Sequence, residues 1–277
     1  MSISWTPAQK QRLRELNVEL SQQEKIFSST TEREIEFKIL EKEAVQKLKG
    51  DWQEYRQGRR VPLLSQLEQK LIGALTKNDF VQVVTPIILS KSLLEKMTIT
   101  DEHPLSKQVF WLDQTKCLRP MLAPNLYFLL KDLLRVWDKP IRIFEIGSCF
   151  RKETQGANHL NEFTMLNLVE MGLPEERRIE RLSELAAIVM DEAGIKDYQL
   201  VSTESEVYGT TVDIEAGIEL GSGAMGPHAL DYQWGINETW VGIGFGLERL
   251  VMRKEGYQTI KRAGRSLTYL DGVRLNI

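Results

Sequence analysis

The sequence predicts an α+β fold, in which an antiparallel β-sheet is flanked by helices and a small helical segment lies at the N-terminus. Short β-branched stretches that are typical of strands alternate with amphipathic helical patterns after about residue 60. Two of these stretches, 141–146 and 163–169, are joined through a polar loop and indicate a hairpin. Strands joined mostly by hairpins, with helices inserted between them, favour an antiparallel sheet.

The composition limits the classes of function. The 277 residues suffice for one large domain or two small ones, and 42% hydrophobic with 27% charged residues is ordinary for a globular protein. With a net charge of -3, a nucleic-acid partner has to bind a local basic patch. No stretch approaches the roughly 18 apolar residues of a membrane span. The cysteines and histidines lack metal-ligand spacing, which argues against a zinc site. We expect a cytoplasmic protein without membrane contact.

The first 60 residues read as polar helices. Thr6 followed by Pro7 predicts an N-cap and the first position of a helix that runs to about Leu20. The capping box Thr31–Glu34 predicts the start of a second, charged helix to about Gln57. We assign residues 1–60 to an N-terminal helical segment and residues 61–277 to one compact domain.

A basic and aromatic cluster ends this segment. It consists of Trp52, Tyr55, Arg56, Arg59 and Arg60. One interpretation is a solvated helix end, and the other is a contact with RNA phosphates and a stacked base.

The main domain begins with a helix from Pro62 to about Lys77, whose leucines form one apolar stripe. A strand at 80–84 follows and ends at Pro86, which favours a sheet edge or a strand end because proline cannot donate to a ladder. The remaining patterns follow in chain order. They predict strands at 109–112, 141–146, 163–169, 198–202, 207–212, 218–220 and 240–246, and helices at 124–137, 174–193 and from 247 onward.

The last predicted strand carries glycine at every second position, Gly242, Gly244 and Gly246, so that all three lie on one face. A strand face without side chains leaves room for a flat ring such as adenine. Arg249 follows closely enough to reach a phosphate. A glycine-rich turn is the alternative, and neither a P-loop nor a GxGxxG fingerprint is present.

Polar residues at other strand ends could complete a nucleotide site. Arg151 and Glu153 lie two residues apart on a strand and hence on the same face, where the guanidinium could hold a phosphate and the carboxylate could accept from the adenine amino group. A surface ion pair is the alternative. Glu219 and Ser222 offer the oxygen ligands that magnesium prefers.

These motifs, in this order, resemble the three signature motifs of class II aminoacyl-tRNA synthetases. The helix and strand ending at Pro86 resemble motif 1. Phe150-Arg151-Lys-Glu153 with His159-x-x-x-Phe163 resembles motif 2, and Gly242-x-Gly244-x-Gly246-x-Glu248-Arg249 resembles motif 3. Longer strings resemble the pyrrolysyl-tRNA synthetases within this class. They are Leu118-Arg-Pro-Met-Leu-Ala-Pro-Asn-Leu-Tyr127, Phe163-Thr-Met-Leu-Asn167 and Val207-Tyr208-Gly209.

The resemblance, which covers about residue 60 to the end, implies a class II synthetase catalytic fold and a ligase that uses ATP and Mg2+. Arg151 and Arg249 would be catalytic. The implied ATP-binding residues are Arg151, Glu153, His159, Phe163, Glu219, Ser222, Gly244, Gly246 and Arg249, with Glu219 and Ser222 holding the metal. The implied amino-acid pocket comprises Ala123, Leu126, Tyr127, Leu130, Met165, Asn167, Val169, Tyr208, Trp240 and Gly242.

The implied partners are a cognate tRNA, pyrrolysine or an ε-acyl-lysine, and a second copy of the chain in a homodimer. The N-terminal segment is expected to contact tRNA, and we expect a form that lacks the separate N-terminal tRNA-binding domain of longer relatives. Two alternatives stay open. One is a class II synthetase for another large amino acid such as phenylalanine, and the other is a synthetase-like regulator that charges no tRNA.

Overall fold

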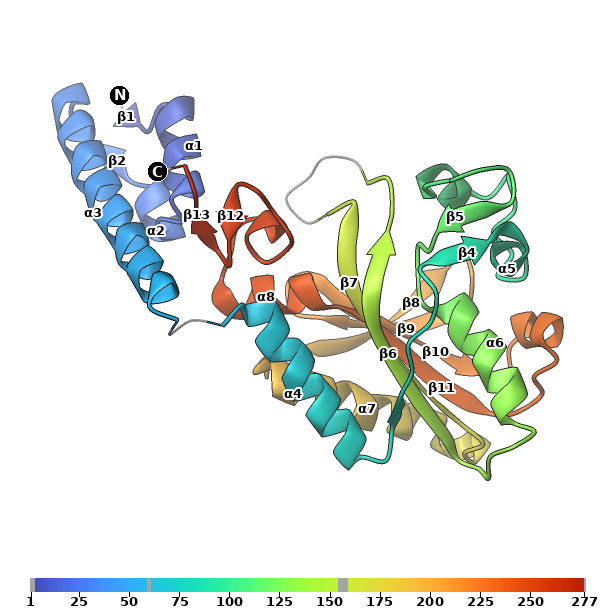
Figure 1. Ribbon diagram of the computed structural model, residues 1–277. Coiled ribbons are helices and arrows are strands. Elements are labelled where there is room, and N and C mark those ends of the chain that lie inside the picture. The colour runs from blue at the N-terminus through green and yellow to red at the C-terminus, as the bar shows by residue number, and fades with distance from the viewer. Residues whose placement is uncertain (1–2, 59–60, 154–158, 277) are drawn as a thin grey trace.

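The structure is a computed structural model that describes residues 3–58, 61–153 and 159–276. Figure 1 shows a small group of N-terminal helices beside a larger unit built on one twisted sheet. Within the described residues this sheet has seven strands, in the order β3-β6-β7-β11-β10-β9-β8. The strands are β3 (Val81–Gln82), β6 (Ile141–Phe150), β7 (Glu162–Met171), β8 (Gln199–Ser205), β9 (Gly209–Glu215), β10 (Glu219–Gly226) and β11 (Trp240–Gly246).

The predicted α+β fold is confirmed, and the antiparallel arrangement holds for every neighbouring pair of this sheet except one. The edge strand β3 runs parallel to β6, with Val81 opposite Ile143. Parallel neighbours need a long connection. Residues 83–140 provide it, and they include the antiparallel pair β4 (Ile88–Ser90) and β5 (Lys116–Leu118), with the helices α5 (Lys91–Glu95) and α6 (Ala123–Leu133).

Helices cover both faces of the sheet (Figure 1). On one face lie α4 (Leu63–Lys77), α7 (Arg178–Ala193) and α8 (Leu247–Glu255). The predicted leucine stripe of α4 is buried in this core at Leu67, Leu71 and Leu75. On the other face lie α5, α6 and the short helix η3 (Ala229–Trp234). Within the described residues, no helix is both long and apolar enough to cross a membrane.

Several predicted boundaries are wrong. The stretch 109–112 forms no strand; it follows the short helix η1 (Pro104–Gln108), and Trp111 makes only an isolated bridge with Cys117. The segment that was predicted as a strand from residue 207 begins at Gly209, because residues 206–208 form the turn between β8 and β9. The predicted helix at 174–193 begins as the short helix η2 (Glu175–Arg177) before α7.

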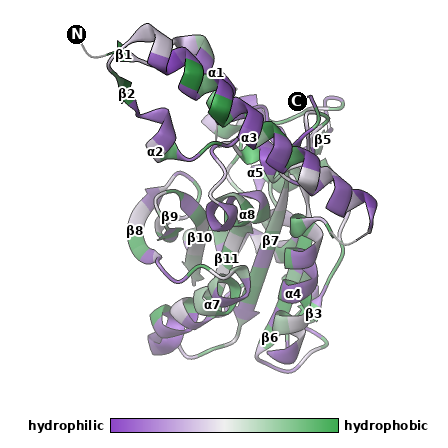
Figure 2. Ribbon diagram, turned by 90° about the vertical axis from the view of Figure 1, so that its left-hand side faces the viewer, coloured by the Kyte–Doolittle hydropathy of each residue, from purple (hydrophilic) through white to green (hydrophobic). Residues whose placement is uncertain are grey.

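The N-terminal part contains β1 (Ile3–Ser4), α1 (Pro7–Glu15), α2 (Leu20–Gln23), β2 (Ile26–Phe27) and α3 (Thr30–Arg56). The cap at Thr6 is confirmed, since its side chain accepts from the Gln9 backbone nitrogen. The predicted capping box at Thr31 is wrong, because the N-cap of α3 is Ser29, whose side chain accepts from the Glu32 backbone nitrogen. Figure 2 shows mainly hydrophilic residues along α3.

The C-terminal residues pack onto these N-terminal helices. A small core joins Trp5, Leu13 and Leu48 to Val273, which lies on β13 (Val273–Arg274) beside β12 (Tyr269–Leu270). Arg262, of the short helix η4 (Ile260–Arg262), is 2% exposed and donates to the carbonyls of Gly272 and Glu15. The charge of Arg262 is therefore used inside the protein.

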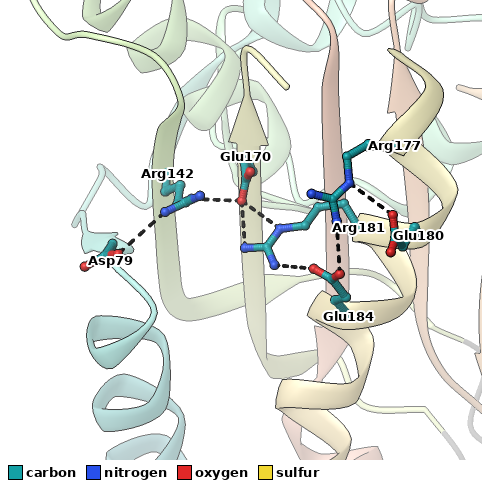
Figure 3. Close-up of polar contacts among 7 residues, drawn as sticks. All are labelled: Asp79, Arg142, Glu170, Arg177, Glu180, Arg181 and Glu184. Carbon is teal, nitrogen blue, oxygen red and sulfur yellow. Dashed lines mark hydrogen bonds and ion pairs between the residues drawn. The ribbon is translucent and has the colours of Figure 1, made fainter. Parts of the chain in front are cut away.

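A network of ion pairs ties the sheet to its helices (Figure 3). Glu170 of β7 is 4% exposed and lies between Arg142 of β6 and Arg181 of α7, with nitrogen–oxygen distances of 2.9 and 2.8 Å. Arg142 also reaches Asp79 in the turn before β3, at 3.6 Å. Because a buried carboxylate is costly without partners, these arginines fix β6, β7 and α7 relative to each other.

Candidate active site

One cavity of about 550 Å³ lies on the sheet face that carries α6, and every site residue predicted from the sequence lines it. The nucleotide group comprises Arg151, Glu153, His159, Phe163, Glu219, Ser222, Gly244, Gly246 and Arg249. The amino-acid group comprises Ala123, Leu126, Tyr127, Leu130, Met165, Asn167, Val169, Tyr208, Trp240 and Gly242. The two groups therefore share one space, while the role of each residue stays a prediction.

The alternation of β7 and β11 builds the floor of this cavity. Gly242 and Gly244 of β11 pair with Val169 and Asn167 of β7. The intervening residues of both strands are buried in the opposite core. A Cβ added to Gly244 would lie 2.7 Å from Oδ1 of Asn167, so the glycine is required for that side chain to lie flat on the sheet.

At the nucleotide end, Arg151 lies directly after β6, and Nε donates to the Pro120 carbonyl at 2.9 Å. Its guanidinium lies 5.3 Å from the Phe163 ring centre. Burial lowers the pKa of Arg151 from its ordinary value. A planar cation held over an aromatic ring, with N–H groups to spare, suits a phosphate oxygen beside a stacked base.

The predicted geometry of Arg151 and Glu153 needs a correction. β6 ends at Phe150, and the Glu153 nitrogen donates to the Arg151 carbonyl at 3.0 Å. This bond closes a tight turn, so the two side chains do not share a strand face, yet both line the cavity. The polar loop that was expected at 154–158 lies outside the described residues.

Arg249 lies in the first turn of α8 and contacts Glu219. Its Nη1 donates to the Glu219 carbonyl at 3.0 Å and lies 3.4 Å from the Glu219 carboxylate. Arg249 and Arg151 thus face one cavity from two elements, as a clamp on one phosphate chain requires.

Glu219 and Ser222 fit a magnesium ion by their donor chemistry. Both supply oxygen atoms to the cavity, the ligand type that magnesium prefers. The Ser222 hydroxyl donates to Asp213 on the paired strand β9 at 2.6 Å. Because its proton is used there, the lone pairs of the Ser222 oxygen stay available to a cation. Asp213 was missed by sequence reasoning, since only the pairing of β9 with β10 reveals it.

The amino-acid end is apolar and aromatic. Ala123, Leu126, Tyr127 and Leu130 come from the first turns of α6, and Trp240 from the start of β11. Tyr208, in the turn between β8 and β9, places its ring 6.3 Å from that of Trp240. Tyr208 thus lies on a hairpin turn at this end of the cavity.

Asn167 is a polar residue in this lining. Its Oδ1 is buried and has no hydrogen-bond partner among the described residues. A buried amide oxygen without a partner is rare and costly. The Asn167 side chain also lines the cavity, so a small turn of its amide would bring this polar group to a ligand there.

Some lining residues were not predicted. Met121, Gln108, Ala224 and Glu248 also face the cavity. Ala224 lies opposite Gly242 on β10, so the run of small residues at 221–224 was an available signal. Glu248 is next to Arg249 in the third motif, but adjacency alone does not indicate that its carboxylate turns inward.

The comparisons with known proteins agree with this geometry. The family model described as the class II core domain (F) of tRNA synthetases matches residues 49–270. A crystal structure of pyrrolysyl-tRNA synthetase from Desulfitobacterium hafniense superposes with a TM-score of 0.94 at 56% identity, covering 100% of both chains. A second pyrrolysyl-tRNA synthetase structure from that organism gives a TM-score of 0.92 at 55% identity, covering 100% of this chain and 99% of the other.

Curated relatives match over shorter regions. The O-phosphoserine--tRNA(Cys) ligase of Methanopyrus kandleri is 26% identical over 183 residues, which are 58% of this chain and 32% of the relative. The threonine--tRNA ligase of Ehrlichia chaffeensis is 33% identical over 98 residues, 34% of this chain and 15% of the relative. The chain thus spans a third or less of the length of these curated relatives. From the family model and the full-length structural matches together, the chain belongs to the class II aminoacyl-tRNA synthetases, in the family of the pyrrolysyl-tRNA synthetases.

Proposed function

We propose that this protein ligates pyrrolysine, or a lysine acylated on its ε-nitrogen, to a cognate tRNA through an aminoacyl adenylate. The observation that carries the choice of amino acid is Asn167, whose Oδ1 is buried without a partner beside an apolar wall. An amide in the substrate brings an N–H for this oxygen and a carbonyl for the Asn167 amide nitrogen. Free lysine would bring an ammonium group into the same apolar space, which is more costly.

In the first step, the ionised carboxylate of the amino acid attacks the α-phosphorus of ATP, an oxygen–phosphorus bond forms, and pyrophosphate leaves. A carboxylate is ionised at neutral pH, so the step needs no protein nucleophile or base. The protein has to align the two groups and stabilise the charge on phosphorus. In this proposal Arg151 binds the reacting phosphate and Arg249 the outer ones, with His159 near the outer ones.

The adenine ring lies, in this proposal, between Phe163 and the glycines of β11, and Glu153 accepts from its amino group. Glu219 and Ser222 hold Mg2+, which when bound neutralises phosphate charge. In the second step, the terminal ribose hydroxyl of the tRNA attacks the carbonyl carbon of the adenylate, an ester forms and AMP leaves. The protein would act in the cytoplasm, where tRNA is charged.

The partners are also part of the proposal. The N-terminal segment, residues 1–60, contacts tRNA together with its basic end. The homodimer forms through α4, β3 and the chain that follows. Apolar side chains stand exposed there at Val81, Val84, Ile87 and Ile88, with 47, 86, 44 and 54% of their surface accessible. An edge strand with exposed apolar residues favours a covering partner.

The test is ATP–pyrophosphate exchange with pyrrolysine, lysine and phenylalanine, in the parent and in Asn167→Ala. The parent should exchange with pyrrolysine alone. The variant should lose selectivity for the amide and accept phenylalanine, because it removes the polar group and adds volume. Preference of the parent for phenylalanine would favour the synthetase for another large amino acid. Absence of exchange with any amino acid would favour the regulator that charges no tRNA.

A further inference from the structure

A buried carboxylate lies behind the aromatic end of the cavity. Asp231 belongs to η3, is 1% exposed and is not itself part of the cavity lining. Its Oδ1 accepts from the Tyr127 hydroxyl at 3.0 Å. Its Oδ2 accepts from the Trp240 indole nitrogen at 2.8 Å and from the His228 backbone nitrogen at 2.7 Å.

These three donors come from separate parts of the chain. Two of the donor residues, Tyr127 and Trp240, line the amino-acid pocket. Tyr127 lies on α6 and Trp240 on β11, more than a hundred residues later. A carboxylate without a proton can only accept hydrogen bonds, and a buried one is costly unless they are made. Asp231 therefore fixes where the Tyr127 hydroxyl and the Trp240 N–H point.

Ring contacts hold the same two side chains from other sides. Tyr127 stacks on Trp234, with ring centres 5.3 Å apart and an angle of 19° between the planes. Tyr127 and Trp240 meet edge to face at 5.8 Å and 85°. The Trp240 indole also lies so close to Gly226 that an added Cβ would collide with it. The Trp240 indole thus lies between the backbone of Gly226 and the ring of Tyr127. Its hydrogen bond to Asp231 selects one orientation of the indole in that space.

We propose that Asp231 is a positioning residue that sets the depth and width of the amino-acid pocket by holding Tyr127 and Trp240. Asp231 does not contact the substrate, but through these two residues it determines which amino-acid side chains fit the pocket. The inference rests on the proposed function, because it concerns the end of the cavity that would hold the acyl group. Without the carboxylate, the hydroxyl and the indole N–H would lose their shared acceptor inside an apolar region, and the two rings would take other positions.

The experiment compares variants at this one position by ATP–pyrophosphate exchange. The probes are Nε-acetyl-lysine, with a small acyl group, and Nε-benzyloxycarbonyl-lysine, with a large one. Asp231→Glu keeps the charge and the acceptors but displaces them by one methylene. Asp231→Asn keeps the shape, since its oxygen can accept from Trp240 and His228 while its NH2 donates to the Tyr127 hydroxyl, which also accepts.

We expect Asp231→Glu to change the ratio of kcat/KM for the two probes by about tenfold, the size of one lost hydrogen bond. KM for ATP should stay within about twofold of the parent, because the nucleotide end is untouched. Asp231→Asn should retain the parent ratio. Leu185→Ala, in the core on the opposite face of the sheet, is the control for general destabilisation and should lower the melting temperature without moving the ratio.

An unchanged ratio in Asp231→Glu would overturn the inference. A rise of KM for ATP equal to the rise of KM for the amino acids would also overturn it. So would an Asp231→Asn variant whose kcat/KM ratio changes as much as that of Asp231→Glu, since the charge of Asp231 rather than its geometry would then matter. If Asp231→Glu does not fold, Asp231→Ser takes its place with the same expected change of ratio. A parent that exchanges with neither probe would count against the proposed function instead.

Discussion

Both carboxylate oxygens of Glu248 lie 2.9 Å from the backbone nitrogen of Thr164. Glu248 is the second residue of α8, and Thr164 follows Phe163 on β7. The contact thus joins the element that carries Arg249 to the strand that carries the proposed adenine-stacking ring. Glu248 is 1% exposed, and burial raises its pKa to about 7, although the N–H of Thr164 opposes this rise.

This pKa predicts that stability falls as the pH rises. In the unfolded chain the carboxyl ionises near its ordinary value of 4.5, whereas in the folded protein it keeps its proton up to about pH 7. Its stabilising contribution is therefore complete below about pH 4.5 and is lost as the pH passes 7. The loss amounts to about 3 kcal/mol of the free energy of unfolding. The free energies of unfolding of the parent and of Glu248→Gln should be measured by urea denaturation at pH 5 and at pH 8. From pH 5 to pH 8, the parent should lose this amount of stability relative to the variant. The exposed Glu176→Gln serves as control, and an equal gap at both pH values would refute the assignment.

Arg151→Ala should abolish adenylate formation while the fold survives. Removing one preorganised donor to a developing charge typically costs about 3 kcal/mol in the barrier, a loss of more than a hundredfold in exchange rate. Lys152→Ala is the matched control, because its side chain is cationic and adjacent but lies outside the cavity lining. Exchange within tenfold of the parent in a folded Arg151→Ala protein would remove Arg151 from its proposed role.

Gly244→Ala should impair amino-acid activation through Asn167. The new Cβ would lie 2.7 Å from the Asn167 Oδ1, so the amide has to leave its place on the cavity floor. We expect KM for an ε-acyl-lysine to rise by about tenfold or more, the effect of displacing one buried hydrogen-bonding group. Gly50→Ala, in α3 with nothing within 4 Å of the added Cβ, should leave both kinetic constants unchanged. Parent-like kinetics for Gly244→Ala would show that Asn167 does not select the substrate.

Val84→Glu should dissociate the proposed homodimer. Val84 is 86% exposed next to the edge strand β3, where a charge would have to be buried in the interface. Sedimentation velocity at micromolar concentration should find a dimer for the parent and a monomer for the variant. Val136→Glu, equally a charge on an exposed valine but beyond the end of α6, should stay dimeric. A parent that is monomeric and fully active contradicts the proposal.

Neutralising Arg56, Arg59 and Arg60 should weaken tRNA binding and leave exchange intact. Arg56 is exposed at the end of α3, whereas Arg59 and Arg60 lie outside the described residues. Trp52 donates to the Arg274 carbonyl at 3.2 Å, so its indole N–H is engaged within the protein. Loss of three phosphate contacts should reduce the slope of log affinity against log salt by about 2 units. Unaltered affinity and slope would restore the interpretation as a solvated helix end.

The sequence predicted the cavity floor best, because strand alternation is a local property. The period of two in Gly242, Gly244 and Gly246 places three residues on one face whatever their surroundings. The run Val109–Leu112 has strand-like side chains too, but Val109 is fully buried and the chain there continues from a short helix. β4 and β5, with three residues each, are too short to leave a periodic signal.

Long-range partners were beyond prediction for a different reason. Asp231 looks like one more polar residue of a loop, and only the folded chain brings it to Tyr127, 104 positions earlier. The parallel pairing of β3 with β6 likewise depends on how residues 83–140 cross the sheet, which no local pattern encodes.

The core shared by the first and last parts of the chain has a consequence for synthesis on the ribosome. Trp52 bonds to a carbonyl 222 positions later, and Arg262 to one 247 positions earlier. The helices α1 to α3 leave the ribosome well before Val273, which completes their small core. Translation proceeds at about 5–20 residues per second, so these helices wait on the order of ten seconds or more for their final contacts. During that interval Trp5 and Leu13 lack part of their apolar cover, so a nascent chain would expose these side chains to chaperones.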